Sequence, residues 1–140
     1  MKITKKSGYG LIAMAELARN NDNHRYLSTI QISKKYDLPQ PFLEKIMREL
    51  KDAGLVKVKR GRGGGYELRS LPEQVSIEEI IRVLEDHRLA PVACLDSNNE
   101  DSCPIEENCP TLKLWKEISD KFTEVLQSLT LSDLVNYMEE

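Results

Sequence analysis

The spacing of apolar residues along the chain predicts a mostly helical fold with one small hairpin. Apolar side chains recur every three or four positions, as on one face of a helix. The stretches with this spacing are residues 3–19, 29–36, 41–53, 77–86 and 111–129, and a last short helix follows Thr130. Only residues 55–69 alternate apolar and polar positions in the manner of strands.

Residues 28–53 have the features of two helices joined by a tight turn. Ser28 and Gln31 form a capping box that begins the first helix. Pro39 ends it, because the residue before a proline disfavours the helical conformation. The second helix has an apolar stripe and a polar face. An ordinary amphipathic helix would look the same, but a helix that reads a DNA major groove would present this polar set: Gln40, Pro41, Glu44, Lys45 and Arg48.

Residues 55–69 predict a β-hairpin with a basic stalk and a tip that contains four glycines. So much glycine predicts a tip without a packed role, which can approach a sugar-phosphate backbone closely. The alternative, a nucleotide phosphate loop, requires a Lys-Ser/Thr pair and a helix after the glycines, and neither follows. A helix-turn-helix followed by such a wing predicts binding to duplex DNA, with wing contacts from Lys59, Arg60, Arg62 and Gly63.

Charge is divided unevenly along the chain. Residues 1–69 contain 15 Lys and Arg against 7 Asp and Glu, a net charge of +8, whereas residues 70–140 contain 5 against 16, a net charge of −11. Unequal halves can serve solubility alone, but the basic half coincides with the helix-turn-helix and wing, which favours DNA as the partner. Further candidate phosphate contacts lie at the starts of the first two helices: Lys5, Lys6, Ser7 and Ser28.

All three cysteines lie in one polar, irregular segment, residues 91–110: Cys94, Cys103 and Cys109. No apolar run is long enough to cross a membrane and no signal-peptide core follows the N-terminus, so we expect a cytoplasmic protein with reduced thiols. Thiolates suit iron–sulfur clusters and zinc. Three ligands leave a coordination position open, which suits a sensor better than a closed structural zinc site. Three unliganded thiols, or a site that takes zinc, remain the alternatives.

Residues 111–129 predict the longest helix, with an apolar seam at spacings of three and four: Trp115, Ile118, Phe122, Val125 and Leu129. An amphipathic helix usually buries such a seam within its own domain. The winged core is expected to be closed by its own helices, so pairing with a second copy is the interpretation we favour. A two-fold dimer would match a palindromic operator.

The capped helix, the stretch LPQPFLEKIMRELKDAGLV, the wing KRGRGGGYEL and the three-cysteine segment together resemble the Rrf family of bacterial winged-helix regulators. The resemblance covers nearly the whole chain, and the wing is its most specific part. It implies that Arg60 is the minor-groove arginine and that Glu44 contacts bases. It also implies an iron–sulfur cluster, because the iron-sensing members have three cysteines before a helix that contains tryptophan, here Trp115.

The sequence departs from the family pattern at three places. Eight residues separate the first two cysteines, where the iron–sulfur and nitric-oxide regulators have five. Leu112 replaces the histidine ligand of the iron–sulfur regulator, and Gly8 replaces the acidic residue of the nitric-oxide regulator. The fourth ligand is therefore unassigned, and its candidates are a small molecule or one of Asp96, Asp101, Glu106 and Glu107.

These features predict a mostly α fold with a small β-wing, a winged helix-turn-helix plus a long C-terminal dimerisation helix. We divide it into a DNA-binding domain (residues 1–90), a cysteine-containing sensor loop (91–110) and a dimerisation segment (111–140). The predicted function is a homodimeric transcription regulator, most simply a repressor, switched by a two-iron or four-iron cluster that responds to iron, redox state or nitric oxide. One alternative is a cluster-free regulator controlled by a partner protein or small molecule. The other, a cysteine enzyme, has little support, since His87 is the only histidine near the loop.

Overall fold

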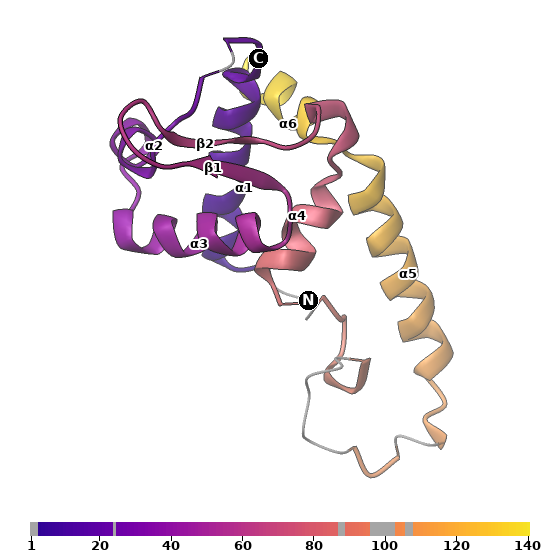
Figure 1. The fold of residues 1–140 in the computed structure, drawn as a ribbon. Coiled ribbons are helices and arrows are strands. Elements are labelled where there is room, and N and C mark those ends of the chain that lie inside the picture. The colour runs from indigo at the N-terminus through magenta and orange to yellow at the C-terminus, as the bar shows by residue number, and fades with distance from the viewer. Residues whose placement is uncertain (1–2, 24, 87–88, 96–102, 106–107) are drawn as a thin grey trace.

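The computed structural model describes residues 3–23, 25–86, 89–95, 103–105 and 108–140. Helices and an antiparallel hairpin form a head, from which a long helix extends along one side (Figure 1). The head contains α1 (Lys5–Arg19), α2 (Thr29–Tyr36), α3 (Gln40–Asp52), β1 (Val56–Lys59), β2 (Gly65–Leu68) and α4 (Ile77–Leu84). The long helix α5 (Leu112–Ser128) and the short helix α6 (Leu131–Met138) follow.

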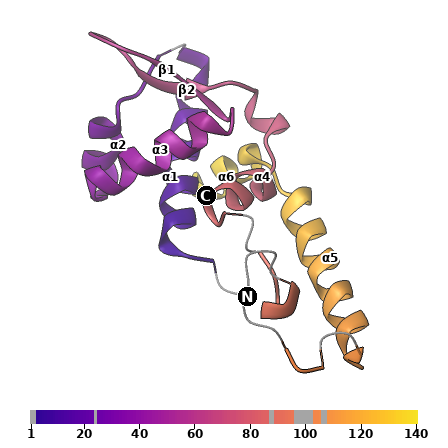
Figure 2. The same cartoon turned by 60° about the horizontal axis from the view of Figure 1, so that its bottom comes forward.

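This architecture confirms the predicted fold class. Each predicted helix that was given two bounds lies within two residues of its observed limits, and α2 has the predicted limits. The hairpin pairs Val56 with Leu68 and Lys59 with Gly65. It lies at the edge of the head and projects from it, as a wing does (Figure 2).

The core of the head is made by the apolar stripes of its helices. Side chains from α1, α2, α3, α4 and the hairpin form one buried cluster, whose fully buried members include Met14, Ile32, Leu43, Ile46, Met47, Leu50 and Ile80. At Gly10 of α1 an added Cβ would lie 2.1 Å from Leu84 Cδ1, so a glycine here allows α4 to pack closely against α1.

The last helix also returns to the head. Leu131 of α6 is fully buried in the core cluster. Two backbone hydrogen bonds join the segment before it to the segment before α4: Ile77 N–H to Leu129 O at 2.8 Å and Leu131 N–H to Val75 O at 2.9 Å. The domain boundary predicted at residue 111 therefore separates α6 from the helices of residues 1–90, against which it packs.

The long helix α5 is attached to the head through its C-terminal half. Leu126 packs with Ile77 and Ile81 of α4 in a second apolar cluster. The first turns of α5 extend beyond the head in both views (Figures 1 and 2). Across the described ranges, no helix combines the length and apolar composition needed to span a membrane.

Candidate nucleic-acid interface and cysteine segment

The polar face of α3 is turned outward because its apolar stripe is buried in the core. All four stripe residues are buried. Of the predicted reading residues, Gln40 is half-buried and the others are exposed: Pro41, Glu44, Lys45 and Arg48. The structure thus brings the five predicted side chains of α3 together on one accessible face.

The carboxylate of Glu44 is oriented by two neighbours. Gln40 Nε2 donates to Glu44 Oε1 at 3.1 Å, and Thr29 Oγ1 donates to the same oxygen at 3.4 Å. Thr29 is buried at the start of α2, so this contact joins the two helices of the motif. A carboxylate only accepts hydrogen bonds, which matches the amino group that cytosine presents in the major groove.

Ser28 begins α2 as predicted. Its Oγ accepts the Gln31 backbone N–H at 3.1 Å, while Gln31 Oε1 accepts the Ser28 backbone N–H at 2.8 Å. The hydroxyl of a serine has one hydrogen and two lone pairs. The capping bond uses a lone pair, so the Ser28 hydroxyl hydrogen is still available to a phosphate oxygen.

Three cationic side chains are exposed at the open end of the wing: Lys59, Arg60 and Arg62. Lys59 Nζ lies 5.7 Å from the centre of the Tyr26 ring, a cation–π distance. Lys57, lower on the stalk, is paired with Glu67 at 3.0 Å, and this hydrogen bond and charge raise the pKa of Lys57. The wing tip therefore offers three cations to DNA, in addition to those of α3. Sequence reasoning missed Tyr26, which precedes the first helix of the motif.

Two of the four wing glycines have a packed role, contrary to the sequence-based expectation, whereas a Cβ at Gly61 or Gly63 would meet no atom within 4 Å. A Cβ at Gly64 would lie 2.1 Å from Lys59 O, and a Cβ at Gly65 would lie 2.4 Å from Leu27 O. Tyr66 N–H donates to Leu27 O at 2.7 Å and Leu27 N–H donates to Tyr66 O at 2.9 Å. The returning strand is therefore fastened to the segment before α2, which fixes the wing relative to the helix-turn-helix.

The start of α1 is occupied by a carboxylate, which contradicts the prediction that Ser7 faces phosphate there. Glu85 Oε1 accepts hydrogen bonds from Thr4 N–H and Thr4 Oγ1 at 2.8 Å and from Ser7 Oγ at 2.7 Å. Ser7 is fully buried. Because the Glu85 carboxylate already satisfies this helix N-terminus, a second anion would be repelled. Lys5 is exposed and remains a candidate phosphate contact.

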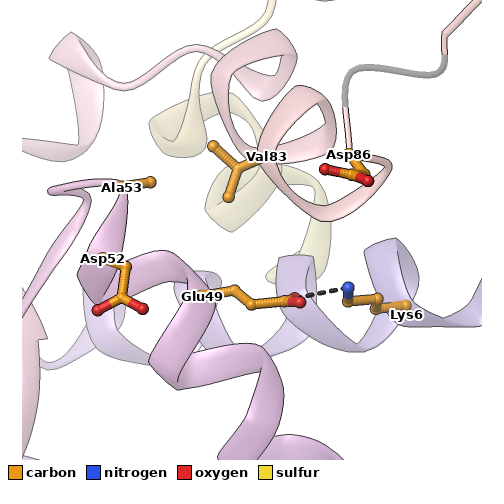
Figure 3. Close-up of a pocket in the computed structure, with 6 residues that line it drawn as sticks. All are labelled: Lys6, Glu49, Asp52, Ala53, Val83 and Asp86. Atoms are coloured by element: carbon orange, nitrogen blue, oxygen red, sulfur yellow. Dashed lines mark ion pairs between the residues drawn. The ribbon is translucent and has the colours of Figure 1, made fainter. Parts of the chain in front are cut away.

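A cavity of about 410 Å³ lies between α1, α3 and α4 (Figure 3). It is lined by Lys6, Glu49, Asp52, Ala53, Val83 and Asp86. Lys6 Nζ lies 2.6 Å from Glu49 Oε2, which ties α1 to α3. The positive charge of Lys6 is therefore already paired. Three carboxylates line the cavity, and their negative charge disfavours phosphate binding at this end of α3.

The three cysteines are free thiols that differ in exposure. Cys94 is half-buried in the short turn Ala93–Leu95, Cys103 is exposed, and Cys109 is half-buried just before α5. Hydrogen bonds from the Thr111 side chain and backbone, and from the Leu112 backbone, lower the pKa of the Cys109 thiol. Within the described ranges, no three His, Cys, Asp or Glu side chains gather closely enough to hold a metal ion. His87 and the acidic candidates Asp96, Asp101, Glu106 and Glu107 lie outside those ranges.

The apolar seam of α5 is shared between the head and solvent. Phe122 and Leu129 pack against the cluster that α4 forms with Leu126, in the same chain. Val125 and Leu114 are 56% exposed. Trp115 and Ile118 are half-buried. The seam thus has an inner part that attaches α5 to the head and an outer part that is open to a partner.

Known proteins similar to this chain include named transcription regulators. The sequence pattern of the Rrf2 family, described as an iron-dependent transcriptional regulator, matches residues 3–137. The HTH-type transcriptional regulator CymR of Bacillus subtilis is 40% identical over 139 residues, which cover 99% of this chain and 93% of CymR. The solved structure of CymR, described as the global cysteine regulator of B. subtilis, superposes with a TM-score of 0.76 over 98% of each chain. The solved structure of T. potens IscR has a TM-score of 0.72 at 29% identity and covers 99% of this chain and 88% of IscR.

Proposed function

Because the chain belongs to the Rrf2 family of DNA-binding transcription regulators, which are not enzymes, we propose that it binds a palindromic operator as a homodimer. In this proposal the N-terminal part of α3 enters the major groove, and the wing follows the backbone into the adjacent minor groove. The predicted contacts on α3 and the wing lie at exposed positions that suit this docking.

The exposed wing tip is the observation that supports this docking best. Arg60 and Arg62 lie on either side of Gly61, and within the described part of the chain neither guanidinium takes part in an ion pair. A narrow minor groove has an enhanced negative potential that attracts an inserted arginine. The hydrogen bonds between Leu27 and Tyr66 hold the hairpin in place, so little ordering entropy is lost when it docks.

Arg60→Ala is expected to weaken binding to the operator by about 10- to 100-fold, the loss typical of a specific arginine contact. Fluorescence anisotropy with a duplex selected from random-sequence DNA, at moderate salt, measures the change. Arg82→Ala is the matched control, because it removes the same charge from α4, where Arg82 pairs with Glu78 at 3.5 Å. If the two substitutions weaken binding equally, Arg60 acts only through the net charge of the protein, and the proposed docking is contradicted.

The proposed dimer is supported by the open part of α5. Two large apolar side chains on it, Leu114 and Val125, are more than half exposed. Exposed apolar groups that share one side of a helix mark an interaction surface, and Leu114 and Val125, eleven positions apart, share one side of α5. A second copy of this helix offers the same surface, and the two-fold symmetry that results would place two reading heads on the half-sites of a palindrome.

The finer proposal is that Cys94, Cys103 and Cys109 hold an iron–sulfur cluster. The donor set fits this group, because three soft sulfur ligands are free and accessible or half-buried. The bound cluster would make the conformation of residues 91–110 depend on iron and redox state. This segment connects α4 to α5, so a change in its conformation alters how each head is joined to the dimer helices. The cluster can change operator affinity only as far as it binds the two conformations of the protein with different affinity.

Protein purified without oxygen is expected to be coloured and to contain iron and sulfide, because thiolates bind such clusters. The Cys103→Ala variant is expected to be colourless. Visible absorption with iron and sulfide analysis measures this, and circular dichroism of the variant shows whether it is folded. If the native protein is colourless and free of iron after reconstitution, the cluster proposal fails. The proposal that the protein binds DNA does not depend on that result.

A second candidate is a cluster-free regulator of the same fold, controlled by a partner protein or a small molecule. The similarity to CymR, described as a global cysteine regulator, favours it. A colourless protein that still binds its operator tightly would support this candidate. A coloured protein whose operator affinity changes when the cluster is removed would exclude it.

A further inference from the structure

Cys109, Thr111 and Trp115 form a chain of hydrogen bonds at the start of α5. Thr111 Oγ1 lies 3.3 Å from Cys109 Sγ, and Trp115 Nε1–H donates to the same Oγ1 at 3.1 Å. Thr111 and Trp115 are four positions apart, so their side chains lie on the same face of the helix. We call these three residues the Cys109–Thr111–Trp115 relay.

The Thr111 hydroxyl takes part in the relay and does not cap α5. It is the N-cap residue of α5, where a threonine hydroxyl normally accepts a backbone N–H of the first turn. Here the side chain makes no capping hydrogen bond, and the backbone angles at Thr111 (φ −102°, ψ 0°) are not those of an extended cap. The first turn of α5 thus gives up a capping bond, and the hydroxyl contacts the cysteine instead.

The chemistry of the three groups gives the relay a direction. An indole N–H only donates, so it must use a lone pair of Thr111 Oγ1. The hydroxyl has a single hydrogen, and this hydrogen is then free to point to Cys109 Sγ. When the sulfur has no proton of its own, as in a metal ligand, the hydroxyl hydrogen is the only one that can join the two atoms.

We propose that Thr111 and Trp115 are positioning residues for Cys109: they hold its sulfur against the first turn of α5 and connect the state of that sulfur to the helix that carries the dimer surface. The contacts stand without the cluster, whereas their role in sensing rests on the proposed function of Cys109. Metal ligands in proteins are commonly held in this way by hydrogen-bonding partners that orient them and tune the metal.

Trp115 provides a direct probe of the relay, because it is the only tryptophan in the chain. The metal-free full-length protein should show one indole N–H signal in a proton–nitrogen NMR spectrum. Thr111→Val removes the hydroxyl at nearly constant volume. It is expected to move this signal upfield and to speed its exchange with water, because the indole N–H loses its acceptor.

Thr123→Val is the matched control, since it makes the same change further along α5. It should leave the indole signal in place. Cys109→Ala should also move the signal, because the hydroxyl loses its partner, whereas Cys103→Ala should not. An indole signal that is unchanged in Thr111→Val, or that moves equally in both threonine variants, would overturn the relay.

The sensing role has a separate readout in cluster-loaded protein. Hydrogen bonds to ligand sulfurs favour the reduced, more negative cluster. Thr111→Val is therefore expected to keep the absorption spectrum but to shift the reduction potential to a more negative value, while Thr123→Val leaves it unchanged. Equal potentials in the two variants would overturn the sensing role. A colourless wild-type protein would instead refute the cluster, and the NMR experiment would still decide whether the relay exists.

Discussion

Gly65→Ala is expected to destabilise the protein by about 2–4 kcal/mol and to abolish tight operator binding. The added Cβ would lie 2.4 Å from Leu27 O and 2.8 Å from Ser28 N, both backbone atoms that cannot turn aside. Gly65 also has φ +143°, a conformation that side chains disfavour. Relief of the clash requires the hairpin to separate from Leu27, which breaks the two hydrogen bonds with Tyr66.

Gly54→Ala separates the effect of backbone strain from the effect of the clash with Leu27. Gly54 has φ +81° at the end of α3, but a Cβ there would meet no atom within 4 Å. Its replacement therefore carries only the backbone strain, about 1 kcal/mol, and should leave wing contacts intact. Urea denaturation followed by circular dichroism gives the stabilities, and anisotropy gives operator affinity. Equal losses for the two variants would show that the contact with Leu27 does not hold the wing.

The helices were predictable because their signals are local. The predicted capping box of Ser28 with Gln31 lies within four residues, and the structure has it. Boxes of the same kind begin α4, at Ser76 with Glu79, and α6, at Thr130 with Asp133. The buried stripe of α3 likewise follows from a spacing that the sequence shows directly. The outward direction of the predicted reading residues then follows from helix geometry, without knowledge of the rest of the fold.

Contacts between distant segments could not be predicted in the same way. Glu85 and Ser7 are 78 positions apart, and nothing near either residue indicates that they meet. The role of Gly65 depends on Leu27, which lies beside it only after the wing folds back. The glycines could be recognised as a tip, but their close contacts are a tertiary property. The packing of Phe122 and Leu129 against α4 is likewise a contact between segments that are distant in sequence.

For the proposed sensor site, the sequence identifies the possible sulfur donors but not their geometry. The sequence places three thiols in one segment, which suffices to name a class of ligand. The partner of Cys109 is a threonine two residues away, and its hydroxyl is also bonded by Trp115. A threonine before a helix reads as a cap in sequence, so this second use of its hydroxyl becomes visible only in the structure.

Glu85→Gln is expected to lower the free energy of unfolding at neutral pH by about 1–3 kcal/mol, the usual worth of hydrogen bonds to a charged group. Burial alone would raise the pKa of Glu85, but hydrogen bonds from Ser7 and Thr4 and the charge of Lys6 outweigh it, so the pKa lies below its ordinary value of 4.5. The carboxylate therefore binds a proton less readily in the folded chain than in the unfolded one. Its contribution to stability is complete above pH 4.5 and is lost as the pH falls through the lowered pKa.

Comparison of the two proteins across pH isolates this contribution. The difference in unfolding free energy between wild type and Glu85→Gln should be constant near neutrality and shrink in acid, because a protonated Glu85 resembles glutamine. Glu73→Gln, which neutralises an exposed carboxylate, should change stability by less than about 0.5 kcal/mol at either pH. A difference for Glu85→Gln that persists undiminished at low pH would mean that the shape of the side chain, and not its charge at the start of α1, provides the stabilisation.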